Sequence, residues 1–190
     1  MMDKKHITGI ILSGGNSSRM GKDKGFLLYD GKPFVQHSIE ALKPLVSRIM
    51  IVSNNEEYDV FGQERIEDIV ENAGPLAGIY SGLKQSSTAY NLVLSCDIPL
   101  IKTDILKKLI DAIDDEAEVI QIESQHRNMP LIALYKKSCA YVFLQLLNAG
   151  ERRLQNAVNQ CKVKNVVLDH EEACFTKNIN TPEQLNDILK

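Results

Sequence analysis

Short apolar runs alternate with segments of helical periodicity along almost the whole chain, and this alternation limits the possible folds more than any other feature. The runs are nearly continuous in Ile, Val and Leu, which is typical of strands buried on both faces of a parallel sheet. The predicted strands are 6–13, 48–53, 91–96, 117–122, 131–135 and 163–168. The predicted helices are 34–45, 76–84, 103–113 capped by Thr103, 137–147, 151–159, and a last helix opened by a capping box at 181–184. This order predicts an α/β fold with three layers, α/β/α, around a mostly parallel central sheet.

Length and charge narrow the class of protein. At 190 residues, against roughly 150 residues per domain, the chain is expected to form a single domain over residues 1–190. The 22 basic and 25 acidic residues give a net charge of −3, which argues against a nucleic-acid-binding surface. No apolar run approaches the roughly 18 residues of a membrane span, and the N-terminal segment lacks the apolar core of a signal peptide. We therefore expect a cytoplasmic protein that binds neither nucleic acid nor membrane.

The four cysteines stand far apart in the sequence, at positions 96, 139, 161 and 174. They form no C-x-x-C pair, so neither a zinc site nor a disulfide framework is indicated. We expect reduced thiols in or near the core and assign no chemistry to Cys96.

A loop rich in glycine and cations follows the first predicted strand and runs from Ser13 to Gly25. Glycines allow backbone N–H groups to converge on an anion, and Arg and Lys supply the charge that a polyphosphate requires. The loop fits neither the Walker A pattern, because Gly21-Lys22 is followed by Asp23, nor G-x-G-x-x-G, because Gly14 and Gly15 are adjacent. It is therefore interpreted as a phosphate-binding loop of another type, with a purely structural surface loop as the alternative.

Asp97 is the second candidate site residue. It directly follows the apolar run 91–96, so it is placed at the carboxyl end of a strand, where α/β proteins bind their ligands. An acid at this position suits a divalent cation that bridges carboxylate and phosphate oxygens. The alternative is a cap for the turn that follows. Together, the cationic loop and Asp97 indicate magnesium-dependent nucleotide chemistry.

The loop sequence LSGGNSSRMGKDKG also resembles the signature L-A-G-G-x-S-x-R-M-G-x-D-K of nucleotidyltransferases, and specifically of the molybdenum cofactor guanylyltransferases. Further segments resemble motifs of this family in the same order, at residues 66–68, 74–78, 95–99, 130–134, 149–153 and 178–183. The resemblance covers about residues 7–189. The chain departs from the family pattern at Ser13, where Ala is usual, at Met129, where His is often found, and in the polar stretch 52–55.

This resemblance implies a Rossmann-like nucleotidyltransferase fold and transfer of GMP from GTP to the terminal phosphate of molybdopterin, with release of pyrophosphate. The product would be the molybdopterin guanine dinucleotide cofactor. It implies Mg²⁺ as cofactor, GTP and molybdopterin as small-molecule partners, and proteins of molybdenum cofactor insertion and delivery as further partners. The nucleotide-binding residues that it implies are Leu12, Ser13, Gly14, Gly15, Arg19, Lys24, Asp68 and Asp97.

Within that set, Arg19, Lys24 and Asp97 would be catalytic, and Asp97 would hold Mg²⁺. Asn180 is a candidate second Mg²⁺ ligand or acceptor contact, and Arg152 and Arg153 are candidate acceptor contacts whose alternative is an exposed charged face.

Two other functions stay open at this point. One is a cytidylyltransferase, or another nucleotidyltransferase acting on molybdopterin or a small phosphorylated acceptor. The other is a nucleotide-binding module without catalytic activity, although such a module is expected to have lost Lys24 or Asp97, and both are present.

Overall fold

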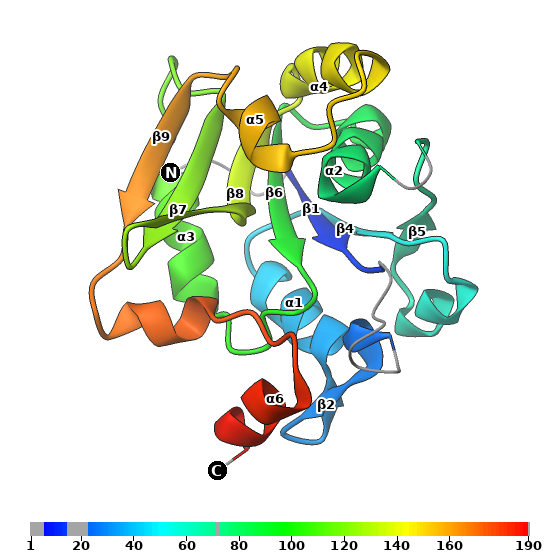
Figure 1. Ribbon diagram of the computed structural model, residues 1–190, viewed down its shortest axis with the longest axis vertical. Coiled ribbons are helices and arrows are strands. Elements are labelled where there is room, and N and C mark those ends of the chain that lie inside the picture. The colour runs from blue at the N-terminus through cyan, green and yellow to red at the C-terminus, as the bar shows by residue number, and fades with distance from the viewer. Residues whose placement is uncertain (1–5, 15–22, 71–72, 190) are drawn as a thin grey trace.

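The structure is a computed structural model that describes residues 6–14, 23–70 and 73–189 (Figure 1). The strands of its main sheet are β1 (Ile7–Leu12), β4 (Arg48–Val52), β5 (Glu64–Ile66), β6 (Tyr90–Ser95), β7 (Val119–Ser124), β8 (Arg127–Lys136) and β9 (Val163–Val167). A small hairpin is formed by β2 (Leu28–Tyr29) and β3 (Lys32–Pro33). The α-helices are α1 (Phe34–Leu42), α2 (Gly74–Gln85), α3 (Thr103–Asp111), α4 (Cys139–Asn148), α5 (Leu154–Val158) and α6 (Pro182–Ile188). Three short 3₁₀ helices are η2 (Lys24–Phe26), η3 (Glu56–Phe61) and η4 (Glu172–Thr176).

The main sheet has seven strands in the order β5-β4-β1-β6-β8-β7-β9. Neighbouring strands pair in parallel except at β8, which is antiparallel to both β6 and β7. The prediction of a mostly parallel sheet is therefore confirmed. Strands β5, β2 and β3 are not among the predicted strands, because each is only two or three residues long.

Helices cover both faces of this sheet. The apolar sides of α1 and α3 pack on one face, and those of α2, α4 and α5 pack on the other. Strand β1 shows why its sequence is apolar throughout, since Ile7 and Ile11 belong to the first core and Ile10 to the second. The predicted α/β/α layering is confirmed. Within the described residues, no helix combines the length and hydropathy needed to cross a membrane.

Two local predictions about helices are wrong. Thr103 does not cap its helix: Lys102 is the N-cap, and the Thr103 hydroxyl donates instead to the Ala41 carbonyl at 3.0 Å, joining α3 to α1. The predicted helix 151–159 begins only at Leu154, because the Glu151 carboxylate accepts bonds from the backbone N–H groups of residues 152 and 153 and holds them in a turn. The capping box at the last helix is confirmed, with Thr181 and Gln184 in the two capping roles.

The end of β6, the chain just before α6, and η2 meet at the carboxyl edge of the sheet, where the candidate site lies. In Figure 1, β6 points toward the end of the molecule where α6 and the β2–β3 hairpin lie. The chain just before α6 runs along this edge, because the Ile179 N–H donates to the Asp97 carbonyl at 2.8 Å. The last segment of the chain is therefore tied to the turn that follows β6.

Candidate active site

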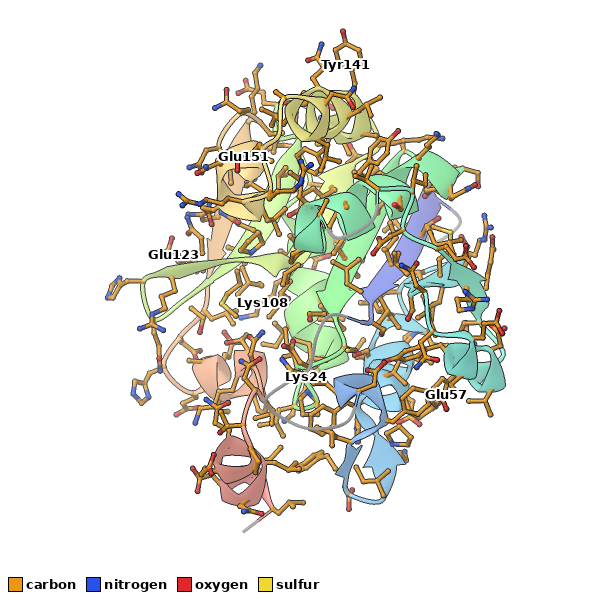
Figure 2. All side chains as sticks on the ribbon, turned by 45° about the vertical axis from the view of Figure 1, so that its right-hand side comes forward. Lys24, Glu57, Lys108, Glu123, Tyr141 and Glu151 are labelled. Carbon is orange, nitrogen blue, oxygen red and sulfur yellow. The ribbon has the colours of Figure 1, made fainter. Side chains whose placement is uncertain are left out.

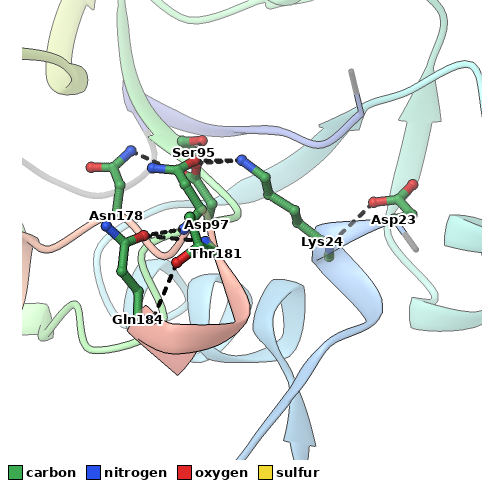
Figure 3. Close-up of polar contacts among 9 residues, drawn as sticks. Asp23, Lys24, Ser95, Asp97, Asn178, Thr181 and Gln184 are labelled. Carbon is green, nitrogen blue, oxygen red and sulfur yellow. Dashed lines mark hydrogen bonds and ion pairs between the residues drawn. The ribbon is translucent and has the colours of Figure 1, made fainter. Parts of the chain in front are cut away.

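Asp97 lies directly after β6, as its place in the sequence predicts, and is only 9% exposed. Its Oδ1 accepts hydrogen bonds from the Ser95 hydroxyl at 2.7 Å and from Asn178 Nδ2 at 3.1 Å (Figure 3). These two donors fix the orientation of the carboxylate and leave Oδ2 directed at a cation. Asp97 is therefore a pre-oriented carboxylate at the strand end rather than a turn cap.

That cation is the ammonium of Lys24. Lys24 Nζ lies 3.5 Å from Asp97 Oδ2 and 2.5 Å from Asn180 Oδ1. The two side chains of the ion pair are largely covered, at 24% and 12% exposed. The structure thus brings together three residues predicted for the site, although Lys24 and Asn180 are 156 positions apart in the chain.

The segment 178–181 is held beside the site by a hydrogen bond from its backbone to the start of α6. The N–H of Asn180 donates to Gln184 Oε1 at 2.7 Å, so the capping box of α6 also fixes the residue that contacts Lys24. Two partners of Asp97, Ser95 and Asn178, are absent from the predicted site residues. Both lie inside the quoted family-like segments, which is the signal that marks them.

Three other side chains hold the backbone around Lys24. Asp23 is the N-cap of η2, and its Oδ1 accepts bonds from the Gly25 N–H at 3.1 Å and from the Tyr58 hydroxyl at 2.6 Å. Asn55 Nδ2 lies 3.4 Å from Asp23 Oδ2. Neither Tyr58 nor Asn55 belongs to the predicted site: Asn55 lies in the polar stretch 52–55, which departs from the family pattern, and no motif includes Tyr58.

The first part of the loop continues directly from β1. The Leu12 carbonyl accepts from the Cys96 N–H, and the Ser13 N–H donates to the Val52 carbonyl, both at 3.0 Å. Gly14 has φ = +128°, which an L-residue rarely adopts. The sheet therefore uses these two backbone groups of residues 12 and 13.

Asp68 lies after β5, beside the first turns of α2. A Cβ placed on Gly78 would lie 3.2 Å from Leu12 Cδ2 and 3.5 Å from Asp68 Oδ1, so both side chains border this glycine. Asp68 Oδ1 is buried and has no hydrogen-bond partner among the described residues. Burial raises the pKa of this carboxyl above its usual value. A buried carboxylate oxygen without a donor is costly in the empty protein and suits a ligand that brings N–H groups.

Some predicted residues do not join this network. Gly15 and Arg19 lie outside the described residues, so their predicted roles stay predictions. Cys96 is buried, and burial raises the pKa of its thiol to about 12, so the thiol is protonated at neutral pH.

Arg152 and Arg153 are exposed and lie between α4 and α5. Arg152 donates from one guanidinium nitrogen to the carbonyls of Leu147 and Glu151, both at 2.9 Å. Glu151, their neighbour in the chain, lies well away from Lys24 in Figure 2. Within the described residues, no hydrogen bond joins either arginine to Lys24, Asp97 or Asn180, so the structure does not bring the arginines into the network.

The donor set around Lys24 Nζ suits a hard cation. It combines one carboxylate oxygen, from Asp97, with one amide oxygen, from Asn180. Mg²⁺ prefers such oxygens and commonly takes only one or two from the protein, with the rest from water and substrate phosphates. Among the described residues there is no group of three or more His, Cys, Asp or Glu side chains that could hold a metal by itself. The residues present therefore fit an ion that is shared with a phosphorylated ligand.

Comparisons with proteins of known structure show the same fold. Molybdopterin-guanine dinucleotide biosynthesis protein A from Archaeoglobus fulgidus superposes with a TM-score of 0.81 over 95% of this chain and 96% of its own, at 22% identity. The 4-diphosphocytidyl-2C-methyl-D-erythritol synthase from Anaerococcus prevotii superposes with a TM-score of 0.78 over 98% of this chain and 95% of its own, at 12% identity. At such identities, these likenesses establish a nucleotidyltransferase fold of the Rossmann-like type.

Comparisons of sequence establish the family. A probable molybdenum cofactor guanylyltransferase from Flavobacterium johnsoniae is 39% identical over 184 residues, 96% of each chain. A molybdenum cofactor guanylyltransferase from Vibrio parahaemolyticus is 31% identical over 97% of this chain and 96% of its own. Residues 9–164 match the family model of the MobA-like NTP transferase domain. The chain therefore belongs to the MobA-like NTP transferases, a family of nucleotidyltransferase enzymes.

Proposed function

We propose that this protein transfers GMP from GTP to the terminal phosphate of molybdopterin, forming the molybdopterin guanine dinucleotide cofactor. The names of the relatives support this reaction. The observation that carries the proposal is the placement of the Lys24 ammonium between oxygens of Asp97 and Asn180, at the edge of the sheet where nucleotides bind in this class of fold.

The reaction forms a bond from a molybdopterin phosphate oxygen to the α-phosphorus of GTP and breaks the bond from that phosphorus to the bridging oxygen of pyrophosphate. A phosphate monoester has a second pKa of about 6, so the nucleophile carries its negative charge at neutral pH without a general base. The barrier is then repulsion between two anions and the charge that develops on pyrophosphate. Positioned cations lower both contributions.

Lys24 is the cation that we assign to the triphosphate, together with Arg19. In the empty site, the Lys24 ammonium lies against Asp97 Oδ2 and Asn180 Oδ1. When GTP binds, this ammonium would turn from those oxygens to the phosphates and stabilise the negative charge on the leaving group. The Lys24 side chain is already ordered at the sheet edge before GTP binds, which lowers the entropy that must be lost when it contacts the phosphates.

Asp97 and Asn180 would then hold Mg²⁺ through the oxygens that Lys24 contacts in the empty site. Bound there, the ion would neutralise charge on the phosphate oxygens of GTP. Ser95 and Asn178 would keep the Asp97 carboxylate in place, since both donate to its other oxygen.

Guanine would bind between the first turn of the loop and Asp68. Asp68 Oδ1 has no donor among the described residues, and a guanine edge offers N–H groups that a carboxylate can accept. Leu12 and Asp68 both border Gly78, and Ser13, Gly14 and Gly15 would supply the backbone contacts.

We assign the acceptor side with fewer observations. Asn180, which contacts Lys24 from the segment before α6, would either help to hold Mg²⁺ or contact the acceptor phosphate. Arg152 and Arg153 would contact the acceptor only where molybdopterin extends toward the α4–α5 turn. We further propose that the protein acts in the cytoplasm and that one domain binds both substrates. Proteins that insert and deliver the molybdenum cofactor would be its partners.

A reconstituted assay tests the reaction. The purified protein is mixed with MgCl₂, molybdopterin and either GTP or CTP, and pyrophosphate release is followed together with the dinucleotide product. We expect release with GTP that depends on both molybdopterin and magnesium. Calorimetry of the two nucleotides checks the base preference, and tighter binding and faster turnover with CTP would assign a cytidylyltransferase instead. Nucleotide binding without pyrophosphate release from either nucleotide would indicate a module without catalytic activity.

A further inference from the structure

The backbone that carries Lys24 rests on a buried tyrosine from another part of the chain. Tyr58 belongs to η3 and is fully buried, with its ring packed against Phe26 at 4.7 Å and Phe61 at 6.1 Å between centroids. Its hydroxyl donates to Asp23 Oδ1 at 2.6 Å. Burial raises the pKa of the Tyr58 phenol, so it stays a hydrogen-bond donor over the physiological range.

Tyr58 also sets the shape of the loop on the other side of Lys24. A Cβ built on Gly25 would lie 2.1 Å from the Tyr58 hydroxyl oxygen, a distance that no real Cβ adopts. The loop backbone therefore lies directly on the phenol, and only glycine fits at position 25. Asp23 accepts from the Gly25 N–H at 3.1 Å, which closes the turn around the lysine.

Asn55 couples the two short helices a second time. Its side-chain oxygen caps η3 by accepting from the Glu57 N–H at 3.0 Å, while its Nδ2 approaches Asp23 Oδ2 at 3.4 Å. Both oxygens of Asp23 thus face donors from residues 55–58. The backbone at residues 23–25 is therefore held by side chains of a different segment, and not only by contacts within itself.

We propose that Tyr58 is a positioning residue for the Lys24 ammonium, acting through Asp23 and the Gly25 backbone. The residues on both sides of Lys24 are fixed by one phenol, so the direction of the lysine side chain is set before any ligand binds. This inference rests on the proposed function for its kinetic consequence, but the placement of Lys24 is a property of the empty protein. A misplacement on the order of 1 Å at a phosphate-binding cation can lower a rate by about a hundredfold.

Tyr58→Phe is the direct test, and Tyr135→Phe is its matched control. Tyr135 is equally buried, and its hydroxyl makes one hydrogen bond, to the Pro130 carbonyl at 2.7 Å, in β8. Both variants lose one buried hydrogen bond, and Tyr58→Phe should lower the melting temperature at least as much as Tyr135→Phe, because its lost acceptor is a carboxylate. We expect Tyr58→Phe to lower kcat about tenfold with little change in KM for GTP, and Tyr135→Phe to leave both unchanged. Equal kcat in the two variants contradicts the proposal.

A double-mutant cycle tests whether Tyr58 acts through Lys24. In a Lys24→Met background, Tyr58→Phe should produce no further loss of kcat, because there is no ammonium left to position. A further tenfold loss in that background would show that Tyr58 has only a general structural role. Asp23→Asn keeps the Oδ1 acceptor for Tyr58 and Gly25 but sets an NH₂ group against Asn55 Nδ2, so it should lose less activity than Asp23→Ala, which should match or exceed the Tyr58→Phe loss.

Lysine acylation of the protein without substrates separates this inference from the proposed reaction. The ammonium of Lys24 is covered by Asp97 and Asn180, so a limiting amount of an acetylating N-hydroxysuccinimide ester should modify it slowly. Tyr58→Phe should accelerate the labelling of Lys24 by several-fold in peptide mass spectrometry, while Lys137, whose ammonium donates to the Ser86 carbonyl, keeps its wild-type rate. Unchanged Lys24 labelling would overturn the positioning role even in an active enzyme. Faster labelling in a protein that releases no pyrophosphate would uphold that role and count against the proposed reaction alone.

Discussion

Lys24 and the Arg152–Arg153 pair are both cations that the sequence predicts to face phosphates, yet the fold holds them in opposite ways. Lys24 is largely covered, and its ammonium contacts oxygens from two distant segments. The arginines are exposed, and Arg152 donates to the carbonyl of Leu147, in the last turn of α4, and to that of Glu151, just after the helix. A cation placed against a carboxylate and an amide oxygen at the sheet edge is prepared for a ligand, whereas a cation bonded to a helix carbonyl already contributes to stability.

Asp97→Asn should have the largest effect of any substitution at the site. The amide keeps the size of the side chain but removes the charge that Lys24 and the proposed Mg²⁺ require. We expect kcat/KM to fall by about a thousandfold or more, measured as pyrophosphate release. Asp114→Asn is the control, because Asp114 is paired on the surface with Lys164 and should be silent in the assay. Wild-type activity in Asp97→Asn would remove the central acid from the mechanism.

Lys24→Met should lower kcat by about 10²–10³-fold, the loss typical of removing one group that stabilises transition-state charge. The substitution retains the apolar stem and removes the ammonium, so the fold should tolerate it. Its melting temperature is expected to fall only slightly, because Ser95 and Asn178 still donate hydrogen bonds to the Asp97 carboxylate. A loss confined to KM would mean that Lys24 only binds GTP and has no preferential role in the transition state.

Asp68→Asn probes a third position, where a carboxylate oxygen is buried and has no hydrogen-bond partner among the described residues. We expect GTP affinity to fall about tenfold by calorimetry, because guanine would lose its charged acceptor. The same substitution should raise the melting temperature by about 2 °C, since it removes a poorly solvated charge. Lower stability together with weaker binding would mean that Asp68 is an ordinary structural acid.

The pH dependence of stability follows from the raised pKa of Asp68. A carboxyl whose pKa is higher in the folded state than in the unfolded state binds its proton more tightly when folded, so its contribution to stability falls as pH rises from the unfolded to the folded pKa. Asp68→Asn should remove this contribution. Denaturant titrations of the wild type and the variant between pH 4 and pH 7 are the measurement, and the gain from the substitution should be larger at the higher pH.

The two arginine substitutions should have the smallest effects. Arg152→Ala removes the bonds to the α4 carbonyls and should lower the melting temperature by about 2 °C without changing kcat. Arg153→Ala should leave stability unchanged and raise the KM for molybdopterin by no more than about threefold, as for an exposed charge. A hundredfold loss of kcat/KM in either variant would show that the arginines contribute as much to the reaction as Lys24 does.

Much of the fold could be predicted because its signal is local. The apolar run of β6 and the acid that ends it are contiguous, so the position of Asp97 at the sheet edge follows from strand geometry. The cap of α6 is likewise contained in four residues, 181–184. The antiparallel direction of β8 was not among the predictions, because the periodicity of a strand does not encode which neighbour it pairs with.

The sequence by itself determined that two opposite charges would lie at the carboxyl edge of an α/β sheet, since each is adjacent to a strand or its loop. The hydrogen bonds that hold these charges in place are visible only in the tertiary structure, because they join distant residues. The partners Asp23 and Tyr58 are 35 positions apart, Asn178 and Asp97 are 81 positions apart, and Lys24 and Asn180 are 156 positions apart. Periodicity reports on neighbours within a helix or strand, whereas these hydrogen bonds exist only once strand order and loop paths have brought remote segments together.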